Sequence, residues 1–148
     1  HRDLHSFPTR RSSDLVGIQH PRQPGALATL ELGDGEAVGT SGDYQRYFEV
    51  GGRRYSHLLD PRSAEPVRHT QALTVLVSAD AGAGAGTLSD VASKPLFIAG
   101  ADWPRLARAL HVEHVLRVDA EGRVQVSRAM HARLTYVGGQ PKALEIIP

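Results

Sequence analysis

The sequence of 148 residues predicts an α+β fold, built mostly from antiparallel strands with two main helices. Short β-rich runs separated by Gly, Pro and Asp outnumber the segments with helical periodicity. Strands also do not alternate with helices, as they would in βαβ units. The hydrophobic content of 41% is enough to build a buried core.

The N-terminal segment, residues 1–15 (HRDLHSFPTRRSSDL), does not fit this fold. It shows neither strand nor helix periodicity and has no apolar stretch typical of a signal peptide. Residues 5–15 resemble the conceptual translation of a common sequencing adapter; a disordered basic tail is the alternative. We therefore expect residues 1–15 to be non-native, disordered and packed against nothing. Residues 16–148 should form the domain portion, and the natural chain should continue upstream of Val16.

The strongest strand signal is a hairpin. Residues 44–50 and 53–59 flank Gly51-Gly52. A Gly-Gly pair between two β-rich runs predicts a two-residue turn, because both turn positions need positive φ. Asp60-Pro61 then ends the second strand. The other strand candidates are short apolar or alternating runs: residues 16–20, 26–32, 72–78, 114–119, 123–127, 133–137 and 144–147.

Two segments carry helical signals. Thr87 or Ser89 can cap a helix that follows a flexible Ala/Gly loop over residues 79–86, and Pro95 should kink this helix or delay its start. Asp102 is a suitable N-cap for a second helix. The apolar positions of that helix repeat at helical spacing: Trp103, Leu106, Ala107 and Leu110.

Composition excludes several classes of protein. The absence of cysteine excludes disulfides, Cys-ligated zinc and thiol nucleophiles. No apolar run approaches the roughly 18 residues that a transmembrane helix needs. The formal net charge of +1 gives no footprint for nucleic acid, so we expect no nucleic-acid partner.

Three clusters could carry chemistry. Residues 40–44 (TSGDY) form a small polar turn before a strand, which could hold a phosphate or a flavin edge; a plain strand-entry turn is the alternative. His57 could act as a general base or contact phosphate; a half-buried histidine bonded to the backbone is the alternative. Asp90 and Lys94 lie near a helix start, where a carboxylate could bring Mg²⁺ to a diphosphate; a solvated ion pair is the alternative.

Other patterns fail on closer inspection. The alternating glycines of residues 82–86 lack the G-K-[ST] that completes a P-loop. His111 and His114 straddle a predicted helix end without a third zinc ligand nearby in the sequence. Ser41 lacks the glycine pattern of a nucleophile elbow, so a serine hydrolase is not indicated.

In order and spacing, the three clusters resemble the C-terminal half of the FAD:protein FMN transferases of the ApbE family. Residues 40–44 match the family's T-S-G-x-Y segment. Residues 54–62 (RYSHLLDPR) match its histidine-strand-D-P segment, with Leu where Ile is usual. Residues 89–100 resemble its acidic helix. The resemblance runs from residue 16 to residue 148.

This resemblance implies a mechanism and a site. FAD binds with Mg²⁺ on its diphosphate, a Thr or Ser hydroxyl of a target protein attacks the FMN phosphorus, and AMP leaves. His57 is then the candidate catalytic base or phosphate contact. Ser41 and Gly42 line the flavin or phosphate pocket, Leu58 lies beside the flavin, and Asp90 is the metal carboxylate.

Two positions depart from the family's pattern. Lys94 stands where a Thr usually helps to hold the metal. A protonated lysine offers Mg²⁺ no acceptor, but it could touch the diphosphate as a point charge. Ala64 stands where Gly usually follows D-P-x-[ST], which could shift the loop if the backbone there needs positive φ.

The resemblance also implies a longer parent, whose N-terminal half supplies much of the FAD pocket. We expect this chain to be an inactive fragment of it. Its partners are FAD and flavoprotein subunits that bear an acceptor Thr or Ser. The parent should be periplasmic or inner-membrane-anchored, touching the membrane only through an upstream lipid anchor. The alternatives are an FAD diphosphatase of the same family and a non-catalytic flavin-binding protein, which Lys94 favours.

Overall fold

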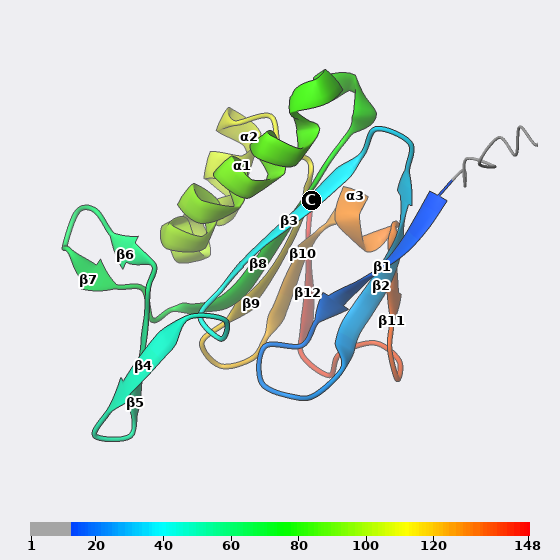
Figure 1. Cartoon of the computed structure of the whole chain (residues 1–148). Helices are drawn as coiled ribbons and strands as arrows, with labels where there is room; N and C mark the ends of the chain where they lie inside the picture. The colour runs from blue at the N-terminus through cyan, green and yellow to red at the C-terminus, as the bar shows by residue number, and fades with distance from the viewer. Residues whose placement is uncertain (1–12) are drawn as a thin grey trace, which may run out of the picture.

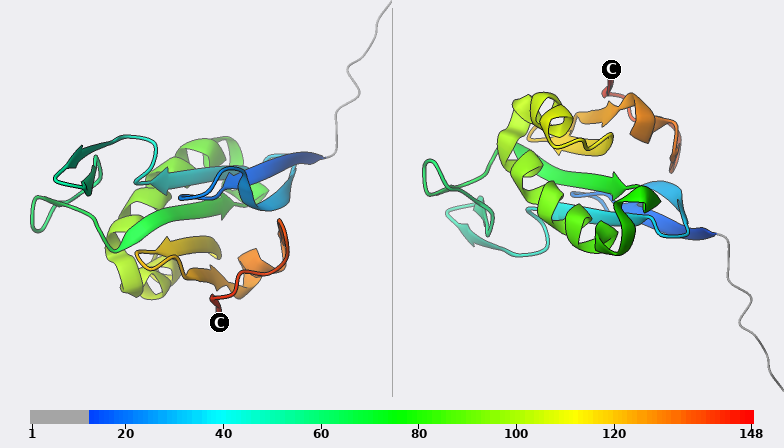
Figure 2. Two further views of the ribbon diagram at one scale, coloured as in Figure 1. Left: turned by 90° about the horizontal axis from the view of Figure 1, so that it is seen from below. Right: turned by 90° about the horizontal axis from the view of Figure 1, so that it is seen from above.

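The structure, a computed structural model, describes residues 13–148. This part of the chain forms three layers (Figures 1 and 2): the helices α1 (Ala85–Ala99) and α2 (Trp103–Ala109), a five-stranded sheet, and a three-stranded sheet. The helices cover one face of the larger sheet, and the smaller sheet packs against the other face. The predicted α+β class, with mostly antiparallel strands and two main helices, is confirmed.

The five-stranded sheet has the order β12-β10-β9-β8-β3, and its only parallel pairing among the described strands joins β10 to β12. Its strands are β3 (Ala37–Gly42), β8 (Thr70–Val77), β9 (His114–Asp119), β10 (Val124–Ser127) and β12 (Leu144–Ile147). All of β8 is buried, which explains its nearly continuous run of apolar residues. The strand predicted at residues 72–78 is therefore confirmed, with an earlier start.

The three-stranded sheet contains β1 (Ser13–Gln19), β2 (Ala26–Gly33) and β11 (Leu134–Tyr136), with β2 in the middle. β1 begins before the expected boundary at Val16, because the backbone of residues 13–15 pairs with residues 31–33 of β2. The expectation that residues 1–15 contact nothing is therefore wrong for these three positions, although the Leu15 side chain is 71% exposed. Residues 1–12 lie outside the described part of the chain, where the expectation stays a prediction.

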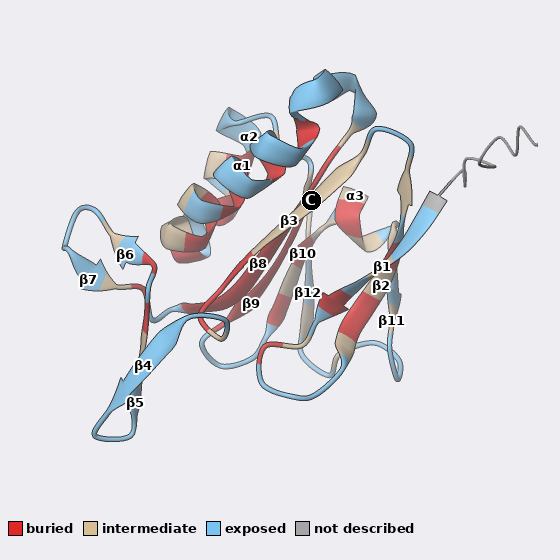
Figure 3. Cartoon of the chain, viewed as in Figure 1, coloured by how far each residue is buried: buried red, intermediate tan, exposed pale blue. Residues whose placement is uncertain are grey.

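Two apolar clusters fill the space between the layers (Figure 3). Alternate residues of β8 point to opposite faces, so Leu73 and Val75 pack under the helices whereas Ala72 and Leu76 pack under the smaller sheet. β8 thus ties both halves of the core together. The neighbouring strand β3, which contains residues of the first predicted cluster, lies at the edge of this sheet and against α1.

The start of α1 differs from the sequence prediction. The helix begins at Ala85, so neither Thr87 nor Ser89 caps it, and Ser89 is instead buried with its hydroxyl donating to the Gly86 carbonyl. The segment before it, expected to be a flexible loop, forms the 3-10 helix η1 (Ala79–Gly84). α1 also continues through Pro95.

The second predicted helix is present as α2, which follows the short 3-10 helix η2 (Gly100–Asp102). Asp102 occupies the N-cap position, but its side chain makes no capping hydrogen bond. The sequence prediction missed a third, short helix, α3 (Arg128–His131). Its N-cap is Ser127, whose hydroxyl accepts from the Met130 N–H.

The predicted hairpin is confirmed as β4 (Tyr47–Val50) and β5 (Arg53–Ser56). Gly51 and Gly52 have φ values of 58° and 73°, as the turn requires. The strands are shorter than predicted, and residues 59–66 form a second small ribbon of β6 (Leu59–Asp60) and β7 (Glu65–Pro66). Both ribbons project from the layered body (Figure 1).

Candidate functional site

A close contact between β3 and α1 is the base of the candidate site. A Cβ atom on Gly39 would lie 2.7 Å from both the carbonyl carbon and the oxygen of Ser89. No side chain larger than hydrogen fits there unless the helix moves away from the strand. Gly39 therefore sets the distance at which α1, and with it Asp90, lies over the edge of the sheet.

The Ser41 hydroxyl joins the same two elements from inside. Ser41 and Ser93 are both buried, and their Oγ atoms lie 2.8 Å apart. Ser93 Oγ also lies 2.9 Å from the Asp90 carbonyl oxygen, which can only accept. Ser93 therefore donates to Asp90, so Ser41 must donate to Ser93. This chain fixes the turn of helix that carries Asp90.

The expectation for residues 40–44 needs correction. The segment was expected to be a turn before a strand, but Thr40, Ser41 and Gly42 end strand β3, paired with β8. The sequence does not reveal this strand, because its residues are small and polar. The strand packs under a helix and so lacks the alternation of apolar and polar side chains that marks a strand with one face in water. Ser41 is 7% exposed and its hydroxyl ties β3 to α1, whereas its predicted place in a flavin or phosphate pocket stays a prediction.

The turn after β3 is held by an ion pair. Both guanidinium nitrogens of Arg22 reach the Asp43 carboxylate, at 2.7 and 2.6 Å. The hydrogen bond to Asp43 raises the pKa of Arg22, so this pair stays charged. A Cβ on Gly42 would lie 2.3 Å from the Tyr44 ring, so glycine at this position lets the ring fold back over β3.

Asp90 and Lys94 form an exposed ion pair on α1. Lys94 Nζ lies 2.7 Å from Asp90 Oδ1, and the Asp90 side chain is 72% exposed. The prediction that both groups share one face of the helix is confirmed. The prediction that they lie at its N-terminus is wrong, because α1 begins at Ala85 and places Asp90 in the second turn. Within residues 13–148 Asp90 and Lys94 thus form the solvated ion pair that the sequence analysis gave as the alternative to a metal site.

His57 lies at the base of the hairpin and is exposed. Its Nδ1 is 2.9 Å from the Arg46 carbonyl oxygen, and its backbone N–H donates to the same oxygen at 3.3 Å. A carbonyl only accepts, so Nδ1 carries the proton and Nε2 of the neutral ring is left with a lone pair. The arrangement presents Nε2 as an oriented base.

Two residues that follow His57, Leu58 and Asp60, make contacts within the fold. Leu58 is 8% exposed and packs in the helix-side core with Val67, so its predicted contact with flavin stays a prediction. Asp60 is bound by Arg62, whose side-chain and backbone N–H groups lower the pKa of Asp60 to about 2. This carboxylate is thus engaged by Arg62, not by His57.

Ala64 occupies a left-handed position. Its φ is 57°, in the turn between β6 and β7, where its N–H donates to the Asp60 carbonyl. The glycine that the family usually has there would adopt this conformation without a Cβ clash. The loop keeps its shape with alanine, at the expense of local strain.

The predicted residues thus fall into two groups. Ser41, Gly42, Asp90 and Lys94 lie on the β3–α1 contact, whereas His57 and Leu58 lie at the base of the projecting ribbons. Within residues 13–148 no hydrogen bond or ion pair links His57 to Asp90 or Lys94. That part of the chain also has no cluster of three or more His, Cys, Asp or Glu side chains suited to a metal ion.

Asp90 is the carboxylate that the β3–α1 contact offers a metal. Mg²⁺ is commonly held by one or two carboxylates together with substrate phosphates. Lys94 binds Oδ1 of Asp90, and the carboxylate keeps its second oxygen, Oδ2, on a side chain that is 72% exposed. Asp90 therefore fits as one ligand of a Mg²⁺ ion whose other ligands come from elsewhere.

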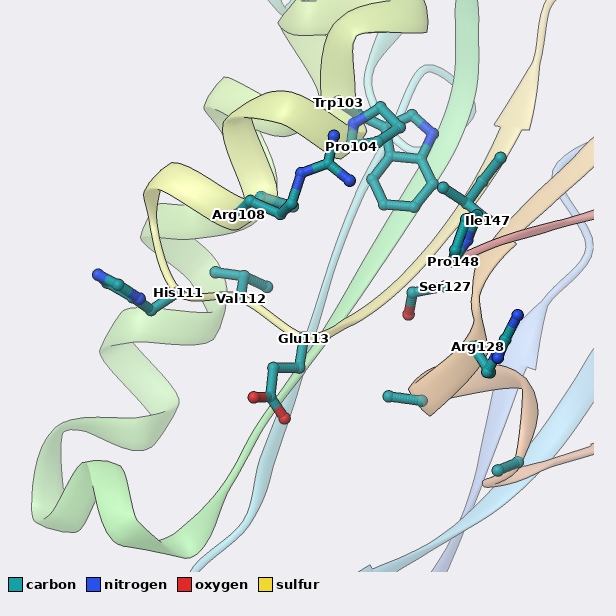
Figure 4. Close-up of a pocket in the computed structure, with 13 residues that line it drawn as sticks. Trp103, Pro104, Arg108, His111, Val112, Glu113, Ser127, Arg128, Ile147 and Pro148 are labelled. Carbon is teal, nitrogen blue, oxygen red and sulfur yellow. The ribbon is translucent and has the colours of Figure 1, made fainter.

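A hollow of about 630 Å³ lies away from both groups, between α2, α3 and the last residues of the chain (Figure 4). Its lining is mostly apolar and includes Trp103 and Ile147, together with the polar residues His111, Glu113 and Arg128. None of the six candidate residues lines it. No helix of residues 13–148 is long and apolar enough to cross a membrane.

Sequence reasoning missed three residues that shape the site. Gly39 and Ser93 stand beside recognised motif positions, and the small-residue run GTSG was the available signal for a close helix contact. The Arg22–Asp43 pair joins positions 21 residues apart, and no local pattern indicates such a contact.

Comparison with known proteins identifies the family. The sequence profile described as ApbE family matches residues 9–116. An FAD:protein FMN transferase from Rhodobacter capsulatus is 42% identical over 134 residues, which make up 89% of this chain and 24% of that protein. One from Haemophilus influenzae is 38% identical over 90 residues, covering 59% of this chain and 24% of that protein.

Two crystal structures resemble this fold. The ApbE protein of Thermotoga maritima has a TM-score of 0.71 and 31% identity, covering 83% of this chain and 38% of that one. The apo flavinyl transferase ApbE of Pseudomonas stutzeri has a TM-score of 0.57 and 32% identity, covering 85% and 38%. The chain thus spans 24% of the Rhodobacter relative and 38% of either solved chain. On the match of profile, sequence and fold, this chain belongs to the ApbE family.

Proposed function

We propose that this chain is the C-terminal portion of an FAD:protein FMN transferase, which moves FMN from FAD onto a Thr or Ser of a target protein. The observation that carries the proposal is the relative of that name, 42% identical over 89% of this chain. The β3–α1 contact supports it, because it holds Asp90 and Lys94 together as an exposed pair of opposite charges on α1.

His57 is the proposed base. The acceptor oxygen forms a bond to the FMN phosphorus while the bond from that phosphorus to AMP breaks, and the hydroxyl proton passes to Nε2 of His57. The bond from Nδ1 to the Arg46 carbonyl orients the ring for this role and stabilises the imidazolium that forms. The base must come within hydrogen-bond reach of the acceptor hydroxyl when the substrates are bound.

Asp90 and Lys94 are proposed to serve the diphosphate. Asp90 would hold Mg²⁺, which when bound neutralises charge on the phosphoryl oxygens. Lys94, whose ammonium is exposed beside the carboxylate, would exchange its contact with Asp90 for one with a phosphate oxygen. Ser41 would act indirectly, by holding through Ser93 the turn of α1 that carries Asp90.

The wider context belongs to the same proposal. The partners are FAD and flavoprotein subunits with an acceptor hydroxyl. We place the parent protein in the periplasm or on the inner membrane, held by an upstream lipid anchor. The chain by itself would be inactive, because the relatives that it matches are several times longer.

Two observations support other functions of the same fold. The exposed Nε2 of His57 could activate water as readily as a protein hydroxyl, which would make the parent an FAD diphosphatase. The Asp90–Lys94 ion pair keeps a metal ligand occupied, which favours a flavin-binding protein without catalysis.

Product analysis separates the three functions. The complete protein that contains this chain is incubated with FAD, Mg²⁺ and a periplasmic extract, and AMP, free FMN and flavin-fluorescent protein bands are quantified. A transferase yields AMP and a flavin-labelled band in equal amounts. A diphosphatase yields AMP and free FMN without a labelled band. FAD that binds but stays intact would overturn both catalytic functions.

A further inference from the structure

The hairpin β4–β5 presents two chemically different faces. In its register Tyr47 pairs with Ser56, Phe48 with Tyr55, Glu49 with Arg54 and Val50 with Arg53. Side chains alternate between the faces of a strand, so Phe48, Val50, Arg53 and Tyr55 share one face. We call these four residues the aromatic face. The opposite face carries Tyr47, Glu49 and Arg54.

The side chains of the opposite face contact one another. The Arg54 guanidinium lies 4.0 Å from the centre of the Tyr47 ring and 3.7 Å from Glu49. Tyr47 and Arg54 also line a hollow of about 320 Å³ with the loop between β1 and β2. This face is therefore used by the molecule itself.

The aromatic face is exposed, and its arginine has no carboxylate partner on the hairpin. Phe48 and Val50 are 59% and 60% exposed, and the rings of Phe48 and Tyr55 stack at 5.2 Å. Arg53 has no ion-pair partner among residues 13–148, and Arg68 lies over the Tyr55 ring at 5.2 Å. The four residues of the face include no carboxylate, and Glu65 lies 3.9 Å from Arg68. An exposed apolar surface flanked by more cations than carboxylates marks an interaction site for an anionic partner.

His57 lies at the end of the hairpin away from its turn. Beyond the last strand pair, Tyr47 and Ser56, the His57 N–H donates to the Arg46 carbonyl, although neither residue belongs to a strand. The candidate base and a further cation, Arg46, thus lie side by side at the foot of the hairpin.

We propose that the aromatic face docks the acceptor segment of the target protein, a stretch with apolar side chains and at least one Asp or Glu near the hydroxyl to be modified. This inference rests on the proposed function. Apolar contacts with Phe48, Val50 and Tyr55 bind the segment. Arg46 and Arg53 select its negative charge, and the hydroxyl is delivered to His57 at the foot of the hairpin.

Charge complementarity and shape favour this occupant. The face carries Arg53 and no acid of its own along an extended hairpin, which suits an extended anionic peptide. FAD is also anionic and aromatic, and binding of FAD to this face would appear in the experiment as a raised KM for FAD in Val50→Glu and Arg53→Gln. A segment of the parent enzyme itself could also cover the face. That arrangement would make the hairpin part of the parent's core, and the experiment distinguishes it.

The test uses the complete enzyme, loaded with FAD and Mg²⁺, and the subunit that becomes flavin-labelled in the product assay, prepared without label. Two variants of one exposed position form a matched pair, Val50→Glu and Val50→Lys. A second pair compares the two faces of one strand, Arg53→Gln and Arg54→Gln. The KM for the acceptor, the KM for FAD and the melting temperature are measured for each.

We expect Val50→Glu and Arg53→Gln to raise the KM for the acceptor by about fivefold or more, since both weaken charge complementarity at the contact. Val50→Lys should leave it unchanged or lower it, and Arg54→Gln should change it by less than about twofold. The KM for FAD should hold throughout. Added salt should raise the acceptor KM of the wild type more than that of Arg53→Gln.

Equal acceptor KM values for both Val50 variants would overturn the proposal, as would equal effects of the two arginine substitutions. A lowered melting temperature and weakened FAD binding in both Val50 variants would show instead that the parent enzyme covers the face. If the wild type labels no subunit, the proposed function fails first. Labelling that proceeds with unchanged acceptor KM in all variants refutes only the docking surface.

Discussion

At the scale of single residues, His57 shows how a backbone contact can prepare a base. The Arg46 carbonyl accepts a hydrogen bond from Nδ1–H, which leaves the lone pair of the neutral ring on Nε2 of this exposed residue. In the complete enzyme, His57→Gln should lower the rate of flavin transfer by about 10²–10⁴-fold, the usual contribution of a general base.

The measurement is the initial rate of AMP formation at saturating FAD and saturating acceptor. His131→Gln is a suitable control, since His131 lies on α3 and contacts Tyr136. A rate in His57→Gln close to that of the wild type would assign the base to another residue.

Ala64 carries a strain that a single substitution can relieve. Its φ of 57° is unfavourable by about 1–2 kcal/mol for a residue with a Cβ. Ala64→Gly should raise the free energy of unfolding by about 0.5–1 kcal/mol, after the greater freedom of glycine in the unfolded chain is deducted. Urea unfolding measures the difference. Ala132→Gly, at a position with φ of −65°, should instead lower stability, and equal effects of both would refute the strain.

At the scale of elements, the β3–α1 contact depends on the missing Cβ of Gly39. Gly39→Ala would put a methyl group 2.7 Å from the Ser89 backbone, which cannot rotate away. We expect a loss of about 1–3 kcal/mol, as for other overpacked sites. Gly86→Ala, in the first turn of α1 with nothing within 4 Å, should raise stability by about 0.5–1 kcal/mol. Thermal unfolding of both variants decides, and a neutral Gly39→Ala would show that the contact is loose.

At the scale of the whole molecule, an ion pair holds the connection between the sheets. Arg133, just before β11, makes two hydrogen bonds to Glu36 in the loop between β2 and β3, and lowers the pKa of Glu36 from 4.5 to about 2. A carboxyl with a lowered pKa stabilises the fold above its unfolded pKa and stops doing so as pH falls through the folded one. The contribution is therefore complete at neutral pH and lost between about 4.5 and 2.

Glu36→Gln should accordingly destabilise the protein at pH 7 by about 1.5–3 kcal/mol, the range for hydrogen bonds to charged groups. The difference from wild type should shrink steadily below pH 4.5. Urea midpoints at several pH values provide the measurement. Glu31→Gln is the matched control, because only the Glu31 backbone contacts Arg133. A difference that is independent of pH would contradict the role of the charge.

Local signals predicted the parts of this fold that local chemistry determines. Gly51-Gly52 identified the hairpin, and the apolar spacing after Asp102 identified α2. β3 was missed because its small residues, among them Gly39, Ser41 and Gly42, show no alternation of apolar and polar side chains. Only pairing with β8 and contact with α1 make them a strand.

The same distinction applies to the candidate site. The motif positions were found from the sequence, and the shared face of Asp90 and Lys94 followed from helix geometry. The partner of the Ser41 hydroxyl could not be foreseen, because Ser93 lies 52 residues away along the chain. The burial of Ser41 likewise depends on long-range packing, so its contact with α1 could not be derived from the segment alone.

The account as a whole depends on Asp90 facing a metal-bound diphosphate. The decisive measurement is AMP release from FAD by the complete enzyme across a Mg²⁺ titration, in wild type, Asp90→Asn and Lys94→Thr. We predict that Asp90→Asn loses most activity at limiting Mg²⁺, because one carboxylate ligand is removed. Lys94→Thr should shift the curve to lower Mg²⁺, since it frees Asp90 Oδ1 and adds an oxygen ligand. Full activity of Asp90→Asn at limiting Mg²⁺ would contradict the account.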